Sequence, residues 1–317
     1  MYDTISVFNE FQSFMTQHTS ENQLFALLKH LDGAYAPNTL RAYRADMLEF
    51  IQYCDYVDAC GLPACPSTVA SFLMQTLGHG HKTATIRRKI SSISAIHRLS
   101  YLEDPTKHPE VKITLRKIAR QLGTRFDQAY PVTRPILDVL LSVCSQDLRG
   151  LRDKALLLLA YDSMRRRSEL VSLCVEDMEW LSNEGASILL RKSKTDQLGT
   201  GKWIHLSSET TQAVLDWLEA ARIEDGFVLR GIDPAGQITA SLCESRVARI
   251  FKSLARRAQL GEHVIQSISG HSMRVGGAQD LMTQGASLPQ IMVKGGWAKT
   301  DTVMRYVERV RPVSSNF

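Results

Sequence analysis

The segment from residue 269 to residue 310 constrains the fold most, because glycines and helix-capping residues divide it into three short helices. Apolar residues recur with helical spacing from Ser272 to Gly285 and again from Ser287 to Gly295. Serine is common just before a helix and glycine just after one, so these residues mark helix ends. A third helix is expected from Thr300, where apolar side chains recur at i, i+3, i+4 and i+7: Val303, Tyr306, Val307 and Val310.

Four polar or aromatic side chains stand near the ends of these helices: His271, Arg274, Trp297 and Tyr306. His271 and Arg274 are three residues apart, so they share a face of the first helical turn, beside free backbone N–H groups. Such a turn is a common binding place for a phosphate group. Taken singly, each residue has a plainer interpretation: His271 caps a helix, Trp297 is a core aromatic, and Tyr306 belongs to an apolar stripe.

Length and composition indicate a globular protein of two domains. The chain has 317 residues, of which 44% are hydrophobic and 22% charged. No apolar run is long enough to span a membrane, and the N-terminus lacks the pattern of a signal peptide. The six cysteines are scattered without a Cys-x-x-Cys pair. We therefore expect reduced thiols, no metal and no cofactor, in a cytoplasmic protein that is nucleoid-associated if it is bacterial or phage-encoded.

Residues 1–125 are expected to form an all-helical domain. Apolar spacing and breakers predict four helices: one that ends at Gly33, then residues 37–54, 67–77 and 83–99. Residues 126–135 show no clear periodicity and contain two prolines, so they are interpreted as a linker.

A basic surface accompanies these helices. Residues 82–120 contain ten Lys or Arg against three acidic residues, with Ser, Thr and Gln interleaved. Such a helical surface suits contacts with DNA phosphates and with base edges in a major groove. An ordinary solvated helix face is the alternative, and the net charge of +5 does not decide between them. The candidate DNA-binding residues of this domain are Arg41, Arg44, Lys82, Thr83, Arg87, Arg88 and Lys89.

Residues 136–317 are expected to form a second, mainly helical domain with a small antiparallel sheet. One helix includes the run Ala-Leu-Leu-Leu-Leu-Ala, which is apolar on all sides and therefore buried. Two short strands, residues 187–191 and 202–206, flank a turn and form a hairpin that carries Lys194. Residues 241–259 form a basic helix that supplies three further candidates for DNA contact: Arg246, Arg249 and Lys252.

The polar residues at helix starts and hairpin edges form a set that suits transesterification at a phosphodiester, without metal or ATP. A phenol serves as nucleophile once its proton is removed, and two arginine forks can bind the non-bridging oxygens, which gain charge in the transition state. A lysine can protonate the leaving oxygen, and a histidine or an indole N–H can donate a further hydrogen bond. In chain order the candidates are Arg166, Glu169, Lys194, His271, Arg274, Trp297 and Tyr306.

Neighbouring residues of the same type compete for two of these places. Arg165 and Arg167 flank Arg166, but the x-x-Glu spacing favours Arg166. Two other hairpin lysines, Lys192 and Lys202, compete with the lysine of the Ser-Lys-Thr sequence. No Ser/His/Asp arrangement, zinc-ligand spacing or Walker-type loop competes for the set.

The order R-R-S-E-L, S-K-T, G-H-S-M-R, G-G-W and then Tyr resembles the tyrosine site-specific recombinases of the phage integrase family. The segment from residue 269 to residue 310 is similar to the Cre-type members in particular. This resemblance covers the C-terminal half of the chain, and APNTLRAY with the helical N-terminal layout fits the family's DNA-clamping domain. Any one of these pieces is a weak signal, whereas the combination is highly specific.

The resemblance implies a role for each candidate. Arg166, His271 and Arg274 are expected to activate and hold the scissile phosphate, and Glu169 to orient its neighbours in support. Lys194 is expected to be the general acid to the leaving 5′ oxygen, and Trp297 to donate a hydrogen bond through its indole. Tyr306 is expected to be the nucleophile that forms a 3′-phosphotyrosine.

The resemblance further implies a two-domain clamp around duplex DNA and sequential strand exchange through a Holliday junction. Two protomers are expected on one inverted-repeat site, and two sites are expected to pair as a cyclic homotetramer. Two other functions stay open on the sequence alone. One is a type IB topoisomerase or telomere resolvase with the same site, and the other is a DNA-binding protein that kept the fold but not the chemistry.

Overall fold

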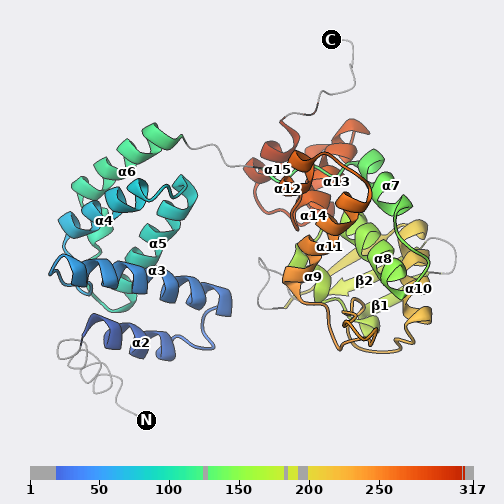
Figure 1. Cartoon of the computed structure of the whole chain (residues 1–317), viewed down its shortest axis with the longest axis horizontal. Helices are drawn as coiled ribbons and strands as arrows, with labels where there is room; N and C mark the ends of the chain where they lie inside the picture. The colour runs from blue at the N-terminus through green and yellow to red at the C-terminus, as the bar shows by residue number, and fades with distance from the viewer. Residues whose placement is uncertain (1–18, 124–127, 182–184, 192–198, 309, 311–317) are drawn as a thin grey trace. The chain divides into compact units, whose positions relative to one another are not determined.

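The computed structural model describes residues 19–123, 128–181, 185–191, 199–308 and 310. The chain divides into two compact units, residues 1–127 and residues 128–317, called the N-terminal and C-terminal units below. Figure 1 shows the helices and strands of each unit, and each unit has its own apolar core.

The regular elements of the N-terminal unit are all helices within its described residues, apart from an isolated β-bridge between Gly61 and Ala64. Proline opens α3, α4 and α6, where its fixed φ suits the first helical turn and its missing N–H costs nothing. The sequence indicated a helical surface over residues 82–120, but it did not show that residues 109–122 form a separate helix, α6. The elements are α2 (Ser20–His30), α3 (Pro37–Tyr56), α4 (Pro66–Gly78), α5 (Thr83–Leu99), the 3-10 turn η1 (Pro105–Lys107) and α6 (Pro109–Leu122).

The C-terminal unit combines helices with one small sheet. Its first half contains α7 (Arg134–Ser142), α8 (Leu148–Ser163), α9 (Arg167–Val171), the 3-10 turn η2 (Val175–Asp177), β1 (Met178–Leu181), β2 (Gly185–Leu190), β3 (Lys202–Leu206) and α10 (Ser208–Ala220). Its second half contains α11 (Glu244–Arg257), α12 (Glu262–Ser267), α13 (Ser272–Thr283), α14 (Leu288–Gly295) and α15 (Thr300–Val307). The predicted fold class, mainly helical with a small antiparallel sheet, is confirmed.

The sheet has the order β1-β2-β3, and both pairs are antiparallel. The predicted hairpin is the β2–β3 pair, in which Ile188 lies opposite Ile204. The edge strand β1 was not foreseen, because three of its four residues are exposed and show no alternation. α8 and α10 pack beside this sheet, and the four consecutive leucines of α8, residues 156–159, are buried as the apolar run predicted.

A second apolar cluster builds the region in which the candidate site lies. It joins Met164, at the end of α8, to residues of α13, α14 and α15. Extended residues just after the start of the unit pass close to α13, where Val132 donates its N–H to the Ser272 carbonyl at 3.1 Å. Gly276 permits this approach, because a Cβ there would lie 1.8 Å from the Val132 carbonyl oxygen. α13 therefore packs against this apolar cluster and also against the segment that contains Val132.

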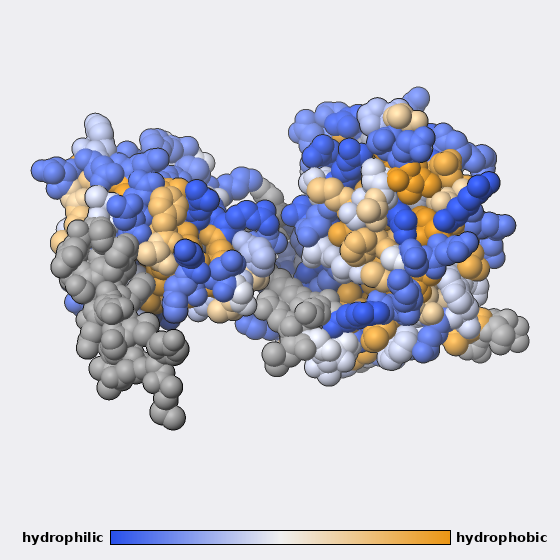
Figure 2. All heavy atoms as spheres, turned by 90° about the horizontal axis from the view of Figure 1, so that it is seen from below, coloured by the Kyte–Doolittle hydropathy of each residue, from blue (hydrophilic) through white to orange (hydrophobic). Residues whose placement is uncertain are grey.

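Within the described residues, no helix is long and apolar enough to cross a membrane. On the face that Figure 2 shows, hydrophilic and hydrophobic residues are intermixed over both units.

Candidate active site

Arg166 and Glu169 form a compact pair at the start of α9. Arg166 is the residue before the helix, and its backbone N–H and its Nη1 donate to the two carboxylate oxygens of Glu169 at 3.1 and 2.6 Å. Glu169 is 3% exposed. Burial alone would raise the pKa of Glu169, but the hydrogen bonds and charge of Arg166 outweigh it and lower that pKa. The pair is therefore ionised, and it fixes one guanidinium at the site.

Arg274 lies in the first turn of α13 and is almost completely buried, with 2% of its surface exposed. Its Nη1 donates to the carbonyl oxygens of Met164 and of Gly295, the latter at 2.7 Å. Its Nη2 is buried and has no hydrogen-bond partner among the described residues. Burial, together with the charges of Arg166 and Arg165, lowers the pKa of Arg274 to about 9. The orphaned donor and the shortage of counter-charge both favour an anion at this place.

Trp297 lies between Arg274 and Tyr306. The Cζ atom of Arg274 is 3.9 Å from the indole ring centre, and the ring centres of Trp297 and Tyr306 are 5.8 Å apart. The core interpretation of Trp297 is also realised, because the ring belongs to the apolar cluster of α13, α14 and α15. Tyr306 is half-buried on α15, and its carbonyl accepts a hydrogen bond from Gln279 of α13 at 2.8 Å. The structure thus brings three predicted site residues into contact, with the ring planes of Trp297 and Tyr306 tilted by 59°.

His271 is the residue before α13, which starts at Ser272 as its apolar periodicity predicted. Its backbone N–H donates to the Ser269 Oγ at 3.2 Å, and its side chain is exposed. It therefore stands at the surface, one turn ahead of the buried Arg274.

The predicted general acid, Lys194, lies outside the described residues, as does Lys192. The described hairpin lysine, Lys202 on β3, lies at the site. It lines a cavity of about 530 Å³ together with Arg165, Arg166 and Trp297. Its Nζ donates to the Val293 carbonyl at 2.5 Å. Burial, with the charges of Arg165 and Arg274, lowers the pKa of Lys202.

The two arginines beside Arg166 have different surroundings. Arg165 is 3% exposed and donates from Nε to the Ser163 carbonyl at 2.9 Å and from Nη2 to the Lys294 carbonyl. Arg167 is exposed and pairs with Glu244 at 3.6 Å. Sequence reasoning treated Arg165 only as a competitor of Arg166 and did not single out Gln279. No local pattern marks either residue, because Lys294, which accepts from Arg165, and Tyr306, which accepts from Gln279, come from other parts of the chain.

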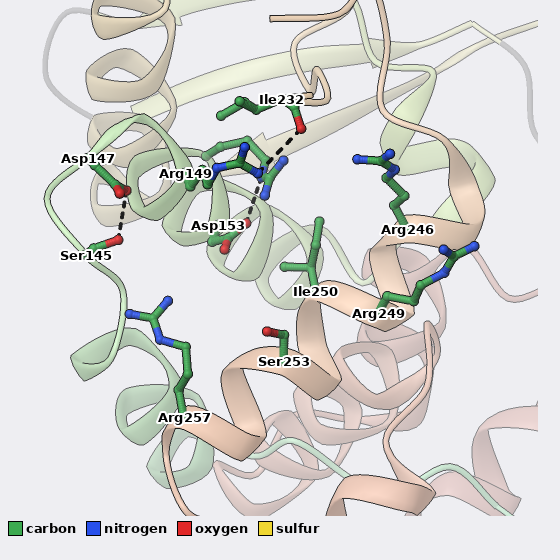
Figure 3. Close-up of a pocket in the computed structure, with 11 residues that line it drawn as sticks. Ser145, Asp147, Arg149, Asp153, Ile232, Arg246, Arg249, Ile250, Ser253 and Arg257 are labelled. Carbon is green, nitrogen blue, oxygen red and sulfur yellow. Dashed lines mark hydrogen bonds and ion pairs between the residues drawn. The ribbon is translucent and has the colours of Figure 1, made fainter. Parts of the chain in front are cut away.

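On α11, Arg246 and Arg249 are exposed and line a cavity of about 430 Å³. Figure 3 shows them projecting from α11 with Arg257, and Arg149 lies on the other side of the cavity. Lys252 does not line it, since its Nζ donates to the Gln266 carbonyl at 2.9 Å. α11 therefore presents an arginine-rich face.

In the N-terminal unit, four candidates already have partners in the structure. Arg41 bonds to Asn38, and the Arg44 guanidinium lies 5.1 Å from the Phe25 ring centre. Thr83 donates to the Gly123 carbonyl at 2.8 Å, and Arg88 pairs with Asp46 at 2.9 Å. Arg87 is exposed, and Lys82 is the exposed residue before α5.

Lys89 requires a correction. Only 1% of its surface is exposed, and its ammonium pairs with Glu49 of α3. A lysine that joins α5 to α3 in this way does not present its charge to DNA. Glu49, a residue of another helix, decides this outcome.

Two protein-family models match this chain. The Phage integrase family matches residues 134–311, and the family's N-terminal SAM-like domain matches residues 23–104. The chain belongs to the phage integrase family. The predicted resemblance and the predicted enzyme class, a DNA strand transferase of the tyrosine recombinase type, are thereby confirmed.

Individual relatives of this family member cover most of its length. An integrase/recombinase xerD homolog from Selenomonas ruminantium is 31% identical, over 89% of this chain and 84% of the relative. Recombinase cre from Escherichia phage P1 is 25% identical, over 87% and 85%.

Solved structures share the fold at lower identity. XerH recombinase bound to palindromic difH substrate, a post-cleavage complex, has a TM-score of 0.66 and 17% identity, over 98% of this chain and 87% of XerH. A lambda integrase dimer bound to a COC′ core site has a TM-score of 0.63 and 16% identity, over 92% and 77%.

Proposed function

We propose that this integrase-family protein cleaves and rejoins duplex DNA at an inverted-repeat site through a 3′-phosphotyrosine intermediate. One observation carries the proposal: buried Arg274 has an orphaned Nη2 and lies over the Trp297 ring, which in turn contacts Tyr306. An unpaired buried donor costs stability unless a ligand satisfies it, so the arrangement suits a phosphate oxygen next to the phenol.

The arginines supply the electrostatic part of the reaction. Arg274 keeps Nη1 on two backbone carbonyls and has Nη2 left for a non-bridging oxygen. Arg166, fixed by Glu169, contributes the second fork, and His271 adds a donor at the helix start. Charge that develops on the phosphorus oxygens would be met by groups that are already in place, which lowers the barrier.

The bonds and protons balance without a further reactant. The Tyr306 oxygen attacks phosphorus and gives its proton to the His271 imidazole or to solvent water; a P–O bond forms, and the bond to the 5′ oxygen breaks. The leaving oxygen takes a proton from a lysine, for which we retain Lys194 as the first candidate. Lys202 is the alternative, because it lies in the same cavity as Arg166 and Trp297. The ester bond is conserved in the phosphotyrosine, so a second strand can reverse the step.

Two surfaces are proposed to hold the DNA. The α11 face with Arg246 and Arg249 supplies one, and α3 and α5 of the N-terminal unit supply the other, through Arg41, Arg44, Lys82, Thr83, Arg87 and Arg88. Exposed arginines suit phosphates and guanine edges. We propose a homodimer on one site and a homotetramer that exchanges strands in sequence through a Holliday junction. The DNA complexes of XerH and lambda integrase, the latter a dimer, support DNA binding.

Covalent trapping tests this proposal. DNA that the protein selects from a random pool is nicked near the centre of the selected repeat, so that a cleaved strand is lost and the adduct accumulates. Wild type should give an SDS-stable adduct, and Tyr306→Phe should give none. Tyr56→Phe is the matched control, since Tyr56 is 84% exposed in the N-terminal unit. An adduct that persists in Tyr306→Phe would assign the nucleophile elsewhere, and no adduct from wild type would favour DNA binding without chemistry.

A further inference from the structure

Two arginines join the same two turns of the C-terminal unit. Arg274 bridges the carbonyls of Met164 and Gly295. Arg165 bridges the preceding carbonyl of each turn, those of Ser163 and Lys294. Two arginine side chains therefore connect residues 163–164 to residues 294–295 by hydrogen bonds. Each arginine donates to one carbonyl of each pair.

Arg165 is an unusual residue to find in this place. It is 3% exposed, and burial lowers its pKa. Within the described residues, the Arg165 guanidinium donates to carbonyl oxygens rather than to a carboxylate. Burying a charge in this way is costly, and an apolar side chain of similar volume is often tolerated as well or better. Stability of the fold alone therefore does not account for an arginine at this position.

The turn after α14 is built closely around Arg165 and Trp297. Gly296 has a φ of +66°, and a Cβ there would lie 2.5 Å from the Arg165 Nη1. At Gly295 a Cβ would lie 1.8 Å from the indole of Trp297. Because both glycines leave room for these side chains, the position of Arg165 and the position of the indole depend on the same turn.

We propose that Arg165 is a positioning residue for strand transfer. It holds the turn of residues 294–296 against the turn that ends in Arg166, and it thereby sets the Trp297 indole over Arg274. Arg166, its neighbour in sequence, binds Glu169 instead, so the two adjacent arginines have separate tasks. This inference rests on the proposed function, since it concerns the same phosphate site.

The test measures the single-turnover rate of adduct formation on the nicked DNA, at saturating protein. Arg165→Met removes the donors while keeping an unbranched side chain, and it should slow cleavage on the order of 10–100-fold with unchanged DNA affinity. Arg165→Lys keeps one charged donor and should recover part of the rate. Arg167→Met is the matched control: its exposed arginine lies two residues away, and its rate should stay within about twofold.

A double-mutant cycle with Trp297→Phe tests the route. If Arg165 acts through the indole, Arg165→Met should cost clearly less in the Trp297→Phe background than in wild type. Equal costs in both backgrounds would overturn positioning through Trp297. If Arg165→Met does not fold, Arg165→Lys takes its place in the cycle. If Arg165→Lys then cleaves at the wild-type rate, the two-carbonyl bridge of Arg165 is not required and the proposal is overturned.

The two proposals fail differently. If wild type forms no adduct, the proposed function fails and this inference falls with it. If wild type forms the adduct and Arg165→Met forms it equally fast, the inference alone is overturned.

Discussion

The guanidinium of Arg274 lies against the indole of Trp297, with Cζ 3.9 Å from the ring centre. Both side chains are buried, so the contact is shielded from water and a cation–π attraction is strengthened. The same indole contacts Tyr306, with ring centres 5.8 Å apart. A phosphate bound by Arg274 would therefore lie within a short distance of the phenol, and the indole is the part that sets this spacing.

Substitution of Trp297 should separate catalysis from stability. Trp297→Phe keeps a ring but loses the N–H and part of the cation–π attraction, so adduct formation should slow roughly tenfold with a small change in Tm. Trp297→Ala should also reduce the free energy of unfolding, by about 3–5 kcal/mol, because it opens a cavity in the cluster of α13, α14 and α15.

Trp180 provides the control for this pair. It is 44% exposed on the edge strand β1. Trp180→Phe should therefore leave the rate of adduct formation unchanged and change the free energy of unfolding by no more than about 0.5 kcal/mol. A Trp297→Phe protein with the wild-type rate would show that the indole is only a core residue.

A substrate with sulfur in place of the bridging 5′ oxygen should identify the general acid. A thiolate leaves without being protonated, since a thiol has a pKa of about 8.5, far below that of an alcohol. Lys194→Met should therefore cleave normal DNA slowly and the sulfur substrate at close to the wild-type rate. Lys202→Met should cleave both substrates with the same reduction in rate, because Lys202 would then act only by lining the cavity and bonding to the Val293 carbonyl. The reverse pattern would assign proton transfer to Lys202.

The helices of the C-terminal segment could be predicted from sequence because their signals are local. Serine and glycine marked residues 272–285, and the observed helix is Ser272–Thr283. The leucine run of α8 is likewise buried as its composition indicated. Local caps and periodicity were sufficient for these elements, since no distant partner was needed to decide them.

Residues whose surroundings depend on distant parts of the chain could not be predicted. Arg165 stands in a run of three arginines, and such a run indicates exposed side chains. Arg165 is nevertheless buried and donates to a carbonyl 129 residues further along the chain. Lys89 was expected at a DNA surface, and Glu49 of another helix holds it in the interior. In both cases the sequence shows correctly that the region is rich in positive charge. Tertiary contacts decide which of its charged side chains are exposed and which are buried.

The N-terminal unit should lose stability in mild acid through His97. This histidine is fully buried on α5, where its Nε2 accepts a hydrogen bond from the Ala64 N–H at 3.0 Å and its Nδ1 bonds to the Ile93 carbonyl at 2.8 Å. Burial lowers its pKa below the ordinary value of 6.5. The unfolded chain then binds more protons, so stability is complete above about pH 6.5 and falls as the pH decreases toward the folded pKa.

Thermal unfolding of wild type and His97→Gln at several pH values measures this effect. Glutamine can still accept from Ala64 but does not titrate, so its Tm should fall less between pH 7.5 and 5 than that of wild type. His79→Gln serves as the control, because His79 is exposed and should leave the wild-type slope unchanged. Parallel curves for wild type and His97→Gln would contradict the assignment.

The close contact at Gly276 gives the last prediction. Gly276→Ala places a methyl group 1.8 Å from the Val132 carbonyl oxygen, and a backbone atom cannot move aside as a side chain can. The free energy of unfolding should fall toward the upper end of about 1–3 kcal/mol, although alanine is the better helix former. Because Val132 bonds to Ser272 at the start of α13, the adduct rate should fall as well. Gly78→Ala, with nothing within 4 Å of its Cβ, should instead be neutral or stabilise by about 0.4–1 kcal/mol, and an equal loss in both variants would show that steric contact with Val132 is not the cause.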